Sequence, residues 1–374
     1  MKVICGKEEL MRGIQTVSPV ASSKSTLPVL SNFLFETEKN IIKLSSTDLE
    51  IAVKCHIKGE IVEEGGITIP AKRFADIIKE LSQDAEIEIR ADETNQINIK
   101  SGKSKFTLMG ISKTEYPVIP EFPKENNFTI KSDVFSSMLK KTVFAVSKDS
   151  QRYVLNGVYF IAEEGVLRMV ATDGRRLAYV TSESLDKKIK GKAIVPTKAI
   201  TDMLRLISAS DDAAEDVKVG IADNQCAIEF RDITFLSTLI EGVFPNYEQV
   251  IPKKTESQVK LSVKDTLTAV KQMALLTGDK LSSDRSSAVK FYFASNVLRI
   301  SASTAGLGSG EVEVEIDYKG EPSEINFNPN FIKEVLQNID EESAVFSFTN
   351  ALNPATLSPE KDKNYLCVVM PMRV

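Results

Sequence analysis

One pattern of secondary structure occurs three times along the chain, and this repeat constrains the fold more than any other feature. Each copy has an alternating apolar strand, a short turn and a second alternating strand, which is the pattern of a β-hairpin. The hairpins begin at Asn32, Asn156 and Ala288, with turns expected at Lys39-Asn40, Glu164-Gly165 and Ser295-Asn296. Chance alternation is the other interpretation, but it would not explain the further landmarks that recur in the same order.

Two helices accompany each hairpin. Opening helices are expected in KEELMRGIQTV (from Lys7), KSDVFSSMLKKTV (from Lys131) and VKDTLTAVKQMALL (from Val263). After each hairpin, apolar residues return at helical spacing behind Pro70, Pro196 and Pro329, which predicts a helix with proline near its first turn. Further strands such as EIEIRA, QINIKS and KFTLMG follow in the first copy. Each third therefore predicts an α+β domain, with antiparallel sheets packed against two helices.

Proline-rich joints separate the three copies. They lie at 116–127 (YPVIPEFPKENN) and 244–258 (FPNYEQVIPKKTESQ). Such segments interrupt helices and strands, so the expected domains are 1–125, 126–252 and 253–374. A length of 374 residues with 42% hydrophobic and 26% charged residues agrees with a soluble protein of two or three domains.

The amino terminus and the cysteines indicate the compartment. The start, MKVICGKEEL, has too short an apolar run for a secretory signal, so we expect a cytoplasmic protein. Cys5, Cys55, Cys226 and Cys367 are far apart and form no CxxC pair. We therefore expect buried reduced thiols, with neither a disulfide framework nor a zinc site.

No catalytic constellation is visible in the sequence. His56 is the single histidine, so triads and multi-histidine metal sites lack their partners. No P-loop motif occurs, and the glycine-rich run 306–310 lacks the strand-to-helix context of a nucleotide site. The expectation is that the protein is not an enzyme and has no catalytic residue, no metal and no cofactor.

The segment VATDGRRLA (170–178) is the most suggestive local motif. Its Thr-Asp-Gly core corresponds to 46–50 in the first copy and to 302–306 in the third, always between two strands. Aspartate and glycine favour tight turns, because aspartate binds nearby amides and glycine accepts positive φ. The turn is therefore part of the repeat, and the pair Arg175-Arg176 is what a binding site in the second copy could use.

Four segments and the repeat together closely resemble one family. They are RYVLNG (152–157), VATDGRRLA, EGVFPNY (241–247) and the terminal YLCVVMPMRV (365–374). With three repeated domains, they resemble the bacterial DNA polymerase sliding clamps, the beta subunits of the replicative DNA polymerase III holoenzyme. The resemblance covers essentially the whole chain. It implies a processivity factor of DNA replication, a head-to-tail homodimer whose six domains form a closed ring with helices lining the hole and sheets outside.

The resemblance also implies an apolar cleft between domains 2 and 3 that binds short peptides. Its partners would be the replicative polymerase, the clamp loader, other polymerases and repair proteins. Adaptable methionines and valines suit such a cleft, although a buried final strand is the alternative for the carboxy terminus. The sequence departs from the family pattern at Arg175, Glu248-Gln249 and Val374. The implied residues are Leu155, Thr172, Gly174, Arg175, Arg176, Leu177, Pro245, Val250, Val368, Val369, Met370, Pro371, Met372 and Arg373.

Double-stranded DNA, bound without sequence preference, is the second implied partner. Basic residues fall on the expected helices, and phosphate contacts do not depend on base sequence. The net charge of −5 argues against tight binding by charge alone, whereas a closed ring needs only weak contacts. Solvated helix faces are the alternative interpretation. The matching positions are Lys24, Arg73, Gln151, Arg152, Tyr153 and Lys198.

Closing a ring requires a contact between the first and third domains. A basic, apolar strand at 103–108 and an acidic strand at 311–315 could pair their edges, although a solvated edge is the alternative for the glutamates. The resemblance places Phe106 and Leu108 at this contact, opposite Leu275 and Leu276. The charged residues expected beside them are Lys105, Glu311, Glu313 and Glu315. Two other functions stay open: an enzyme that uses Asp173 with Arg175 or Arg176, and a protein-interaction scaffold that does not bind DNA.

Overall fold

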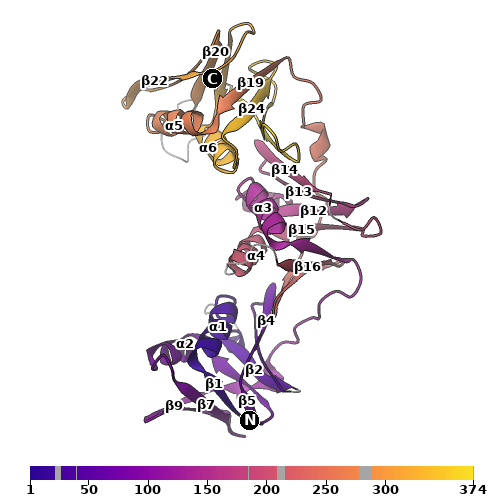
Figure 1. The fold of residues 1–374 in the computed structure, drawn as a ribbon, viewed down its shortest axis with the longest axis vertical. Coiled ribbons are helices and arrows are strands. Elements are labelled where there is room, and N and C mark those ends of the chain that lie inside the picture. The colour runs from indigo at the N-terminus through magenta and orange to yellow at the C-terminus, as the bar shows by residue number, and fades with distance from the viewer. Residues whose placement is uncertain (22–26, 39, 184, 209–214, 278–287, 374) are drawn as a thin grey trace. The chain divides into compact units, whose positions relative to one another are not determined.

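The computed structural model describes residues 1–21, 27–38, 40–183, 185–208, 215–277 and 288–373. The chain forms two compact units, whose helices and strands are labelled in Figure 1. Unit 1 consists of 1–133 and 201–239, and unit 2 consists of 134–200 and 240–374. The division passes through two helices, α3 (Ser132–Val143) and α4 (Thr197–Ser208). Within the described ranges, no helix combines the length and hydrophobicity that crossing a membrane requires.

Unit 1 contains two antiparallel sheets. The smaller has the order β5-β1-β7-β8-β9 and the larger β10-β6-β2-β3-β4-β18-β17-β16-β11. Two helices, α1 and α2, pack on one another, and α1 also lies against β3 and β4. The strands and helices are β1 (Lys2–Gly6), α1 (Lys7–Val17), β2 (Asn32–Glu38), β3 (Ile41–Thr47), β4 (Ile51–Ile57), β5 (Glu60–Glu63), β6 (Gly66–Pro70), α2 (Ala71–Glu80), β7 (Glu86–Ala91), β8 (Gln96–Ser101), β9 (Ser104–Met109), β10 (Ile111–Ser112), β11 (Asn127–Lys131), β16 (Asp216–Ile221), β17 (Gln225–Phe230) and β18 (Ile233–Thr238).

Unit 2 also contains two antiparallel sheets. Their orders are β15-β12-β13-β14-β26-β25-β24-β19 and β22-β21-β20-β23. Helices α5 and α6 pack together, and α5 lies against β20, β21 and β22. The elements are β12 (Gly157–Glu163), β13 (Val166–Thr172), β14 (Arg176–Ser182), β15 (Gly191–Pro196), β19 (Ser257–Ser262), α5 (Val263–Ala274), β20 (Val289–Ala294), β21 (Val297–Thr304), β22 (Gly308–Glu315), β23 (Ser323–Phe327), α6 (Pro329–Gln337), β24 (Ser343–Phe348), β25 (Ala355–Pro359) and β26 (Tyr365–Val369).

The repeat predicted from the sequence is present in the fold. Each expected hairpin forms, as β2–β3, β12–β13 and β20–β21, and each expected helix lies where its apolar spacing placed it. The prolines differ slightly in role. Pro329 is the first residue of α6, whereas Pro70 and Pro196 end β6 and β15 directly before a helix. Proline suits both places, because its fixed φ fits a first helical turn and a strand end.

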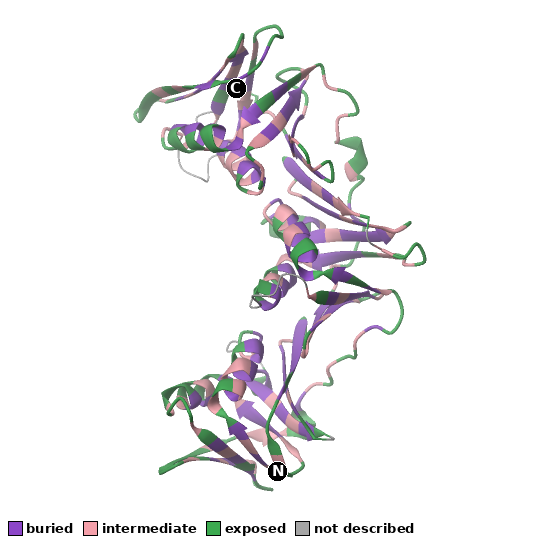
Figure 2. Ribbon diagram, viewed as in Figure 1, coloured by how far each residue is buried: buried purple, intermediate pink, exposed green. Residues whose placement is uncertain are grey.

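The two units cut across the three expected domains because the large sheets continue from one repeat into the next. In unit 1, β4 of the first repeat pairs with β18 of the second. In unit 2, β14 of the second repeat pairs with β26 of the third. A strand edge left open would be a site for aggregation, and these pairings cover it. In both units, buried residues recur along the strands and on the helices (Figure 2).

A cluster of phenylalanines holds the two sheets of unit 2 together. Phe291 and Phe293 of β20 and Phe327 of β23 meet Phe346 and Phe348 of β24, which belongs to the other sheet. Ring centroids lie 4.6 Å apart for the pair Phe293–Phe348 and 5.7 Å apart for Phe327–Phe346. All five rings are fully buried. Such aromatic pairs stabilise a core beyond their buried area.

Replacing Phe346 by alanine should destabilise unit 2 by about 3–5 kcal/mol, because removing a ring from the centre of the cluster leaves a cavity. Hydrogen exchange of the β20 and β24 amides, measured across a urea titration, reports the free energy of unfolding of this unit. Leu352→Ala is the control, since Leu352 is 65% exposed and its truncation should cost under about 0.5 kcal/mol. Equal losses for the two variants would contradict the assignment of the core.

Candidate functional site

The Thr-Asp-Gly turn between β13 and β14 is closed by its own side chains. Asp173 Oδ1 accepts hydrogen bonds from the amides of Arg175 (2.9 Å) and Arg176 (3.0 Å). Thr172 Oγ1 accepts from the amide of Gly174 (3.0 Å) and donates to the carbonyl of Arg176 (2.6 Å). Gly174 has φ of +83°, a region where glycine is favoured. The carboxylate of Asp173 therefore stabilises the turn by accepting hydrogen bonds from its backbone amides.

The guanidinium of Arg176 is a structural cation. It is 8% exposed, its Nε donates to Asp173 (3.2 Å), and its Nη2 donates to the carbonyl of Phe144 (2.6 Å). Nη1 forms an ion pair with Glu334 of α6. The rings of Phe144 and Phe331 lie 5.4 and 4.7 Å from the guanidinium carbon. Arg176 thus connects β14 to α6 and to the end of α3, whereas its neighbour Arg175 is exposed.

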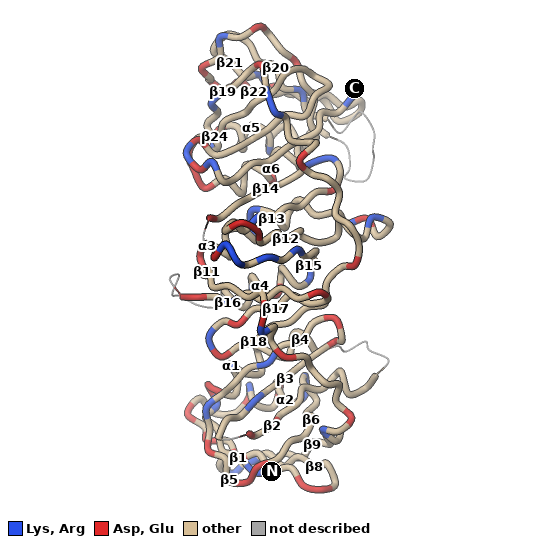
Figure 3. Tube along the Cα trace, turned by 90° about the vertical axis from the view of Figure 1, so that its right-hand side faces the viewer, with Lys and Arg blue, Asp and Glu red and all other residues tan. Residues whose placement is uncertain are grey.

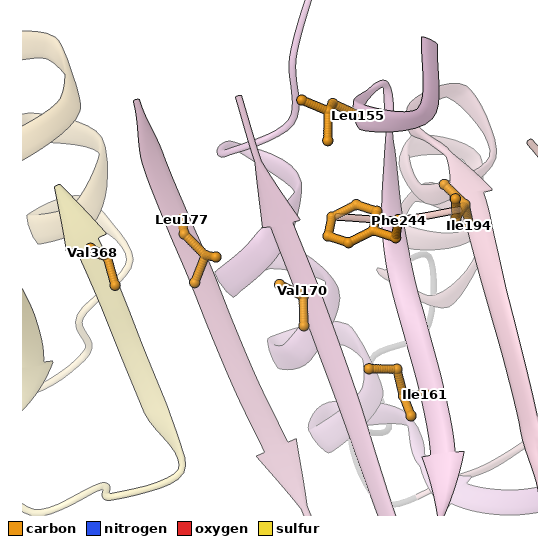
Figure 4. Close-up of a cluster of buried hydrophobic side chains, with 7 residues drawn as sticks. All are labelled: Leu155, Ile161, Val170, Leu177, Ile194, Phe244 and Val368. Atoms are coloured by element: carbon orange, nitrogen blue, oxygen red, sulfur yellow. The ribbon is translucent and has the colours of Figure 1, made fainter. Parts of the chain in front are cut away.

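Beside this turn lies a continuous apolar surface of the sheet. Seven buried side chains form one cluster, in which Leu155 and Phe244 come from segments outside the strands and the other five from neighbouring strands (Figure 4). Leu177 of β14 pairs directly with Val368 of β26, and Leu155 lies at the end of the 3₁₀ helix η3 (Ser150–Leu155). We call this set the junction cluster: Leu155, Ile161, Val170, Leu177, Ile194, Phe244 and Val368.

The connecting segment after β18 packs on the junction cluster through aromatic side chains. Phe244 stacks on Tyr159 with centroids 4.8 Å apart, and Tyr247 stacks on Tyr179 at 5.9 Å. Partial burial raises the pKa of Tyr247 to about 12, so its hydroxyl stays protonated at neutral pH. Pro245 and Val250, two positions implied by the resemblance, are exposed beside these rings.

The carboxy terminus divides into a buried strand and an exposed end. Val368 and Val369 are buried in β26, so the alternative interpretation of a buried final strand is right for these two residues. Met370 donates its amide to the carbonyl of Arg175 (2.9 Å), and its side chain is exposed. Pro371 and Met372 are half-buried, and Arg373 is exposed. Met370 therefore lies directly beside the Thr-Asp-Gly turn, whereas the amide of Met372 donates to the carbonyl of Asn326 in β23 (2.7 Å).

The structure brings most of the implied peptide-site positions together in unit 2. Sequence reasoning missed four members of the junction cluster and three tyrosines beside it: Ile161, Val170, Ile194, Phe244, Tyr159, Tyr179 and Tyr247. Strand alternation could have indicated Val170, which lies within the quoted motif. A cavity of about 450 Å³ borders the turn and is lined by charged side chains that include Lys148, Asp149, Arg152 and Arg175.

The implied DNA-contacting residues occupy separate places. Gln151, Arg152 and Tyr153 are exposed on η3, and Arg152 Nη1 reaches the carbonyl of Asp173 (3.4 Å). Lys198 is exposed on α4 of unit 2, and Arg73 is exposed on α2 of unit 1. Lys24 lies outside the described residues.

Several basic helix residues have acidic partners within the chain. Arg12 contacts Asp232 (2.6 Å) and Glu9 (3.0 Å), and Lys141 contacts Asp362 (3.1 Å). Basic and acidic residues are both scattered along the tube of each unit (Figure 3). Such pairs lower the positive charge that the helices offer to a phosphate backbone, so any DNA contact here is weaker than the count of lysines and arginines indicates.

The two strands expected at a dimer interface are both sheet edges. β9 is the last strand of the small sheet of unit 1, and its Lys105 and Phe106 are exposed, whereas Leu108 is half-buried. β22 is the edge strand of the four-stranded sheet of unit 2, and it carries Glu311, Glu313 and Glu315 on exposed positions.

An arginine on the neighbouring strand reduces the negative charge of the edge strand β22. Arg299 of β21 binds Glu313 (2.8 Å) and Glu311 (3.4 Å), and these contacts raise the pKa of its guanidinium. The acidic strand is therefore partly neutralised within its own sheet. Leu275 is 80% exposed after α5, and Leu276 is half-buried. The edge strand and the end of α5 thus offer both exposed glutamates and an exposed leucine.

The thiols are unreactive in this fold. Burial raises the pKa of Cys5, Cys226 and Cys367 to about 12 and that of Cys55 to about 11. Thiolates, the nucleophilic form, are therefore scarce at neutral pH. Across the part of the chain that the structure describes, histidine, cysteine and acidic side chains nowhere gather in threes that could hold a metal ion.

Comparison with known proteins identifies the family. Models of the DNA polymerase III beta subunit match here in order: the N-terminal domain over 1–120, the central domain over 129–246 and the C-terminal domain over 248–373. The beta sliding clamp of Chlamydia pneumoniae is 33% identical and aligns over 100% of this chain and 99% of its own. That of Haemophilus influenzae is 31% identical, over 100% of both chains.

A solved structure agrees with the sequence relatives. The DNA polymerase III subunit beta of Pseudomonas aeruginosa has a TM-score of 0.93 and 31% identity and covers 100% of both chains. These findings confirm the resemblance and the three α+β clamp domains expected from the sequence. The chain therefore belongs to the DNA polymerase III beta subunit family, the beta sliding clamps.

Proposed function

We propose that this protein is a DNA sliding clamp and processivity factor: it encircles duplex DNA and tethers the replicative polymerase and other partners to it. Membership of the clamp family over the whole chain carries the proposal. Retention on DNA comes from a closed ring, so weak contacts to phosphates are enough. A net charge of −5 and the paired helix cations fit such loose contact.

The ring would be a head-to-tail homodimer of three-domain chains, with domains at 1–125, 126–252 and 253–374. In it, β9 of one protomer pairs with β22 of the other, which covers two open sheet edges. Phe106 and Leu108 meet Leu275 and Leu276, and Lys105 faces the glutamates of β22. Because Arg299 already binds two of these glutamates, the apolar contacts contribute more to the interface than the charges do.

Partner peptides would bind over the junction cluster, between domains 2 and 3. The exposed or half-buried positions around it are Thr172, Gly174, Arg175, Pro245, Val250, Met370, Pro371, Met372 and Arg373. A buried apolar floor with methionine and proline at its margin suits several different apolar sequences. Arg176 and Val369 act indirectly, since their side chains are buried and hold β14 and β26 in place.

DNA would contact Lys24, Arg73, Gln151, Arg152, Tyr153 and Lys198. The five described residues of this set are exposed, and the basic ones suit sequence-independent phosphate contacts. An enzyme that uses Asp173 is the weaker alternative, because three donors of its own turn occupy this carboxylate. We therefore propose no catalytic residue, no metal and no cofactor, and a place of action in the cytoplasm, where the replicative polymerase and clamp loader are.

Loading onto nicked circular DNA tests encirclement directly. The protein, loaded by its clamp loader with ATP, should stay on the circle during gel filtration and leave within minutes after a restriction enzyme linearises the DNA. Dissociation follows because a closed ring slides off free ends. Retention after cutting, equal to that on the circle, would mean ordinary phosphate or base contacts and would refute the ring.

The dimer contact is tested by Phe106→Glu. A charge in the apolar edge contact should give a monomer by light scattering and abolish retention on circular DNA. Val62→Glu is the matched control, because Val62 is exposed on β5, the opposite edge of the same sheet. Dimers of unchanged stability with Phe106→Glu would place the interface elsewhere.

The peptide site is tested by deleting residues 370–374, a change that spares the buried strand β26. The affinity for a fluorescein-labelled clamp-binding peptide from the replicative polymerase should fall at least about tenfold, or about 1.4 kcal/mol. Deletion of Val374 alone is the control. The dimer mass should not change in either variant, and undiminished peptide affinity after the longer deletion would refute this site.

A further inference from the structure

Unit 1 contains a second copy of the Thr-Asp turn, built from the same hydrogen bonds. Asp48 Oδ1 accepts from the amides of Glu50 (3.0 Å) and Ile51 (2.7 Å). Thr47 Oγ1 accepts from the amide of Leu49 (3.0 Å) and donates to the carbonyl of Ile51 (2.8 Å). Each bond has its counterpart in the turn 172–176. The two turns therefore place their residues equivalently, with Leu49 at the position of Gly174 and Glu50 at that of Arg175.

The strands beside this turn repeat the arrangement of the junction cluster. In unit 1, Ala52 of β4 pairs with Leu236 of β18, as Leu177 pairs with Val368 in unit 2. The amide of Thr238 donates to the carbonyl of Glu50 (2.8 Å), as that of Met370 donates to the carbonyl of Arg175. The sheet junction in unit 1 is therefore a structural equivalent of the one proposed to bind peptides.

A small apolar cavity lies over this second junction. Its volume is about 180 Å³, and its lining includes Leu49, Ala52, Ile119 and Leu236. The wall is the extended segment 117–120, in which Val118 is 96% exposed. Pockets for small molecules usually exceed about 300 Å³, so this cavity suits one large side chain of a peptide better than a cofactor.

Leu49 is held in an unfavourable conformation at the cavity's margin. Its φ is +78°, a region that is unfavourable for a residue with a Cβ, and glycine takes this place in the other turn. Among the described non-glycine residues with positive φ, Leu49 is the one with an aliphatic side chain. It is also 54% exposed, so its side chain recovers little of this cost by burial. An exposed leucine kept in this conformation indicates a use outside folding.

The charge around the cavity is opposite to that around the turn in unit 2. Glu50 lines the cavity, and Asp48, Asp223 and Glu121 directly adjoin lining residues. The nearest cation along these strands, Lys54, binds Glu121 (3.0 Å) and the carbonyl of Pro120 (2.8 Å). In unit 2 the corresponding turn has Arg175, with Lys148 and Arg152 beside it. The margin in unit 1 is therefore acidic and complements a cationic ligand.

We propose that this cavity is a second peptide-docking site, which takes a short extended segment of a partner protein with a large apolar side chain flanked by lysine or arginine. The apolar side chain fills the space over Ala52 and Leu236, in contact with Leu49. The flanking cations lie beside Glu50 and its neighbouring carboxylates. This site adds to the proposed function and does not depend on it, because it involves other residues, in unit 1, and ligands of the opposite charge.

The proposal is tested by fluorescence anisotropy with three fluorescein-labelled peptides. They share a Leu-Phe centre, and its flanking residues are lysine, serine or glutamate. The full-length protein should bind the lysine peptide at least about tenfold more tightly than the glutamate peptide, with the serine peptide between. Glu50→Arg should remove most of this preference, because it places a cation at the margin where Arg175 lies in the other turn. Glu86→Arg is the matched control for net charge, since Glu86 is exposed on β7 of the other sheet in unit 1.

Leu49→Gly separates binding from folding. Glycine accepts the positive φ, so this variant should unfold at the same or higher temperature while its affinity for the lysine peptide falls about fivefold or more. Lysine-peptide binding that survives both Leu49→Gly and Glu50→Arg, or that Glu86→Arg weakens as much as Glu50→Arg does, would overturn the proposal. Binding lost on deletion of 370–374 but kept in Leu49→Gly would assign the peptide to the junction cluster and overturn it too. Retention on circular DNA should be normal in Leu49→Gly, so failure here is distinct from failure of the clamp function.

Discussion

Backbone pairing between strands of successive repeats is the constraint on which the functional surfaces depend. β14 ends a hairpin of the second repeat, and without a partner its edge would be open. Pairing with β26, which arrives almost two hundred residues later, places Val368 opposite Leu177 and brings the chain terminus to the Thr-Asp-Gly turn. Pairing between strands of successive repeats also joins β4 to β18 in unit 1. Each candidate peptide site is thus a product of sheet continuation.

Electrostatic and aromatic contacts then hold the junction in unit 2. Arg176 combines two carboxylates, a carbonyl and two phenylalanine rings, and they come from the turn, α6 and the segment after α3. Burying a cation costs desolvation energy, and ion pairs and hydrogen bonds such as these compensate for it. The junction therefore keeps its shape without help from a ligand, and the exposed residues beside it stay available for binding.

Local features of the sequence predicted much of this fold. Contacts between residues far apart in the sequence were not predicted. Helix periods, hairpins and the turn 172–176 depend on residues close in sequence, and the structure has them where they were expected. The partners of Arg176 could not be predicted, because Glu334 lies in another repeat and no short-range pattern connects the two. Phe244 was missed for a similar reason. It lies in a connecting segment without periodicity, and only the folded chain stacks it on Tyr159. The ion pair between Arg299 of β21 and Glu313 of β22, which partly neutralises the acidic edge strand, likewise joins two different strands.

The two junctions show how one backbone frame can serve ligands of different charge. The threonine and aspartate of each turn make all the side-chain contacts that close it, so the residue after the positive-φ position is exposed and free to vary. That residue is Glu50 in one unit and Arg175 in the other. Exchange between them reverses the local charge at little cost in folding, because exposed surface substitutions usually change stability by about 0.5 kcal/mol or less. Leu49 is different, since its conformation is costly, and a binding role is what would balance that cost.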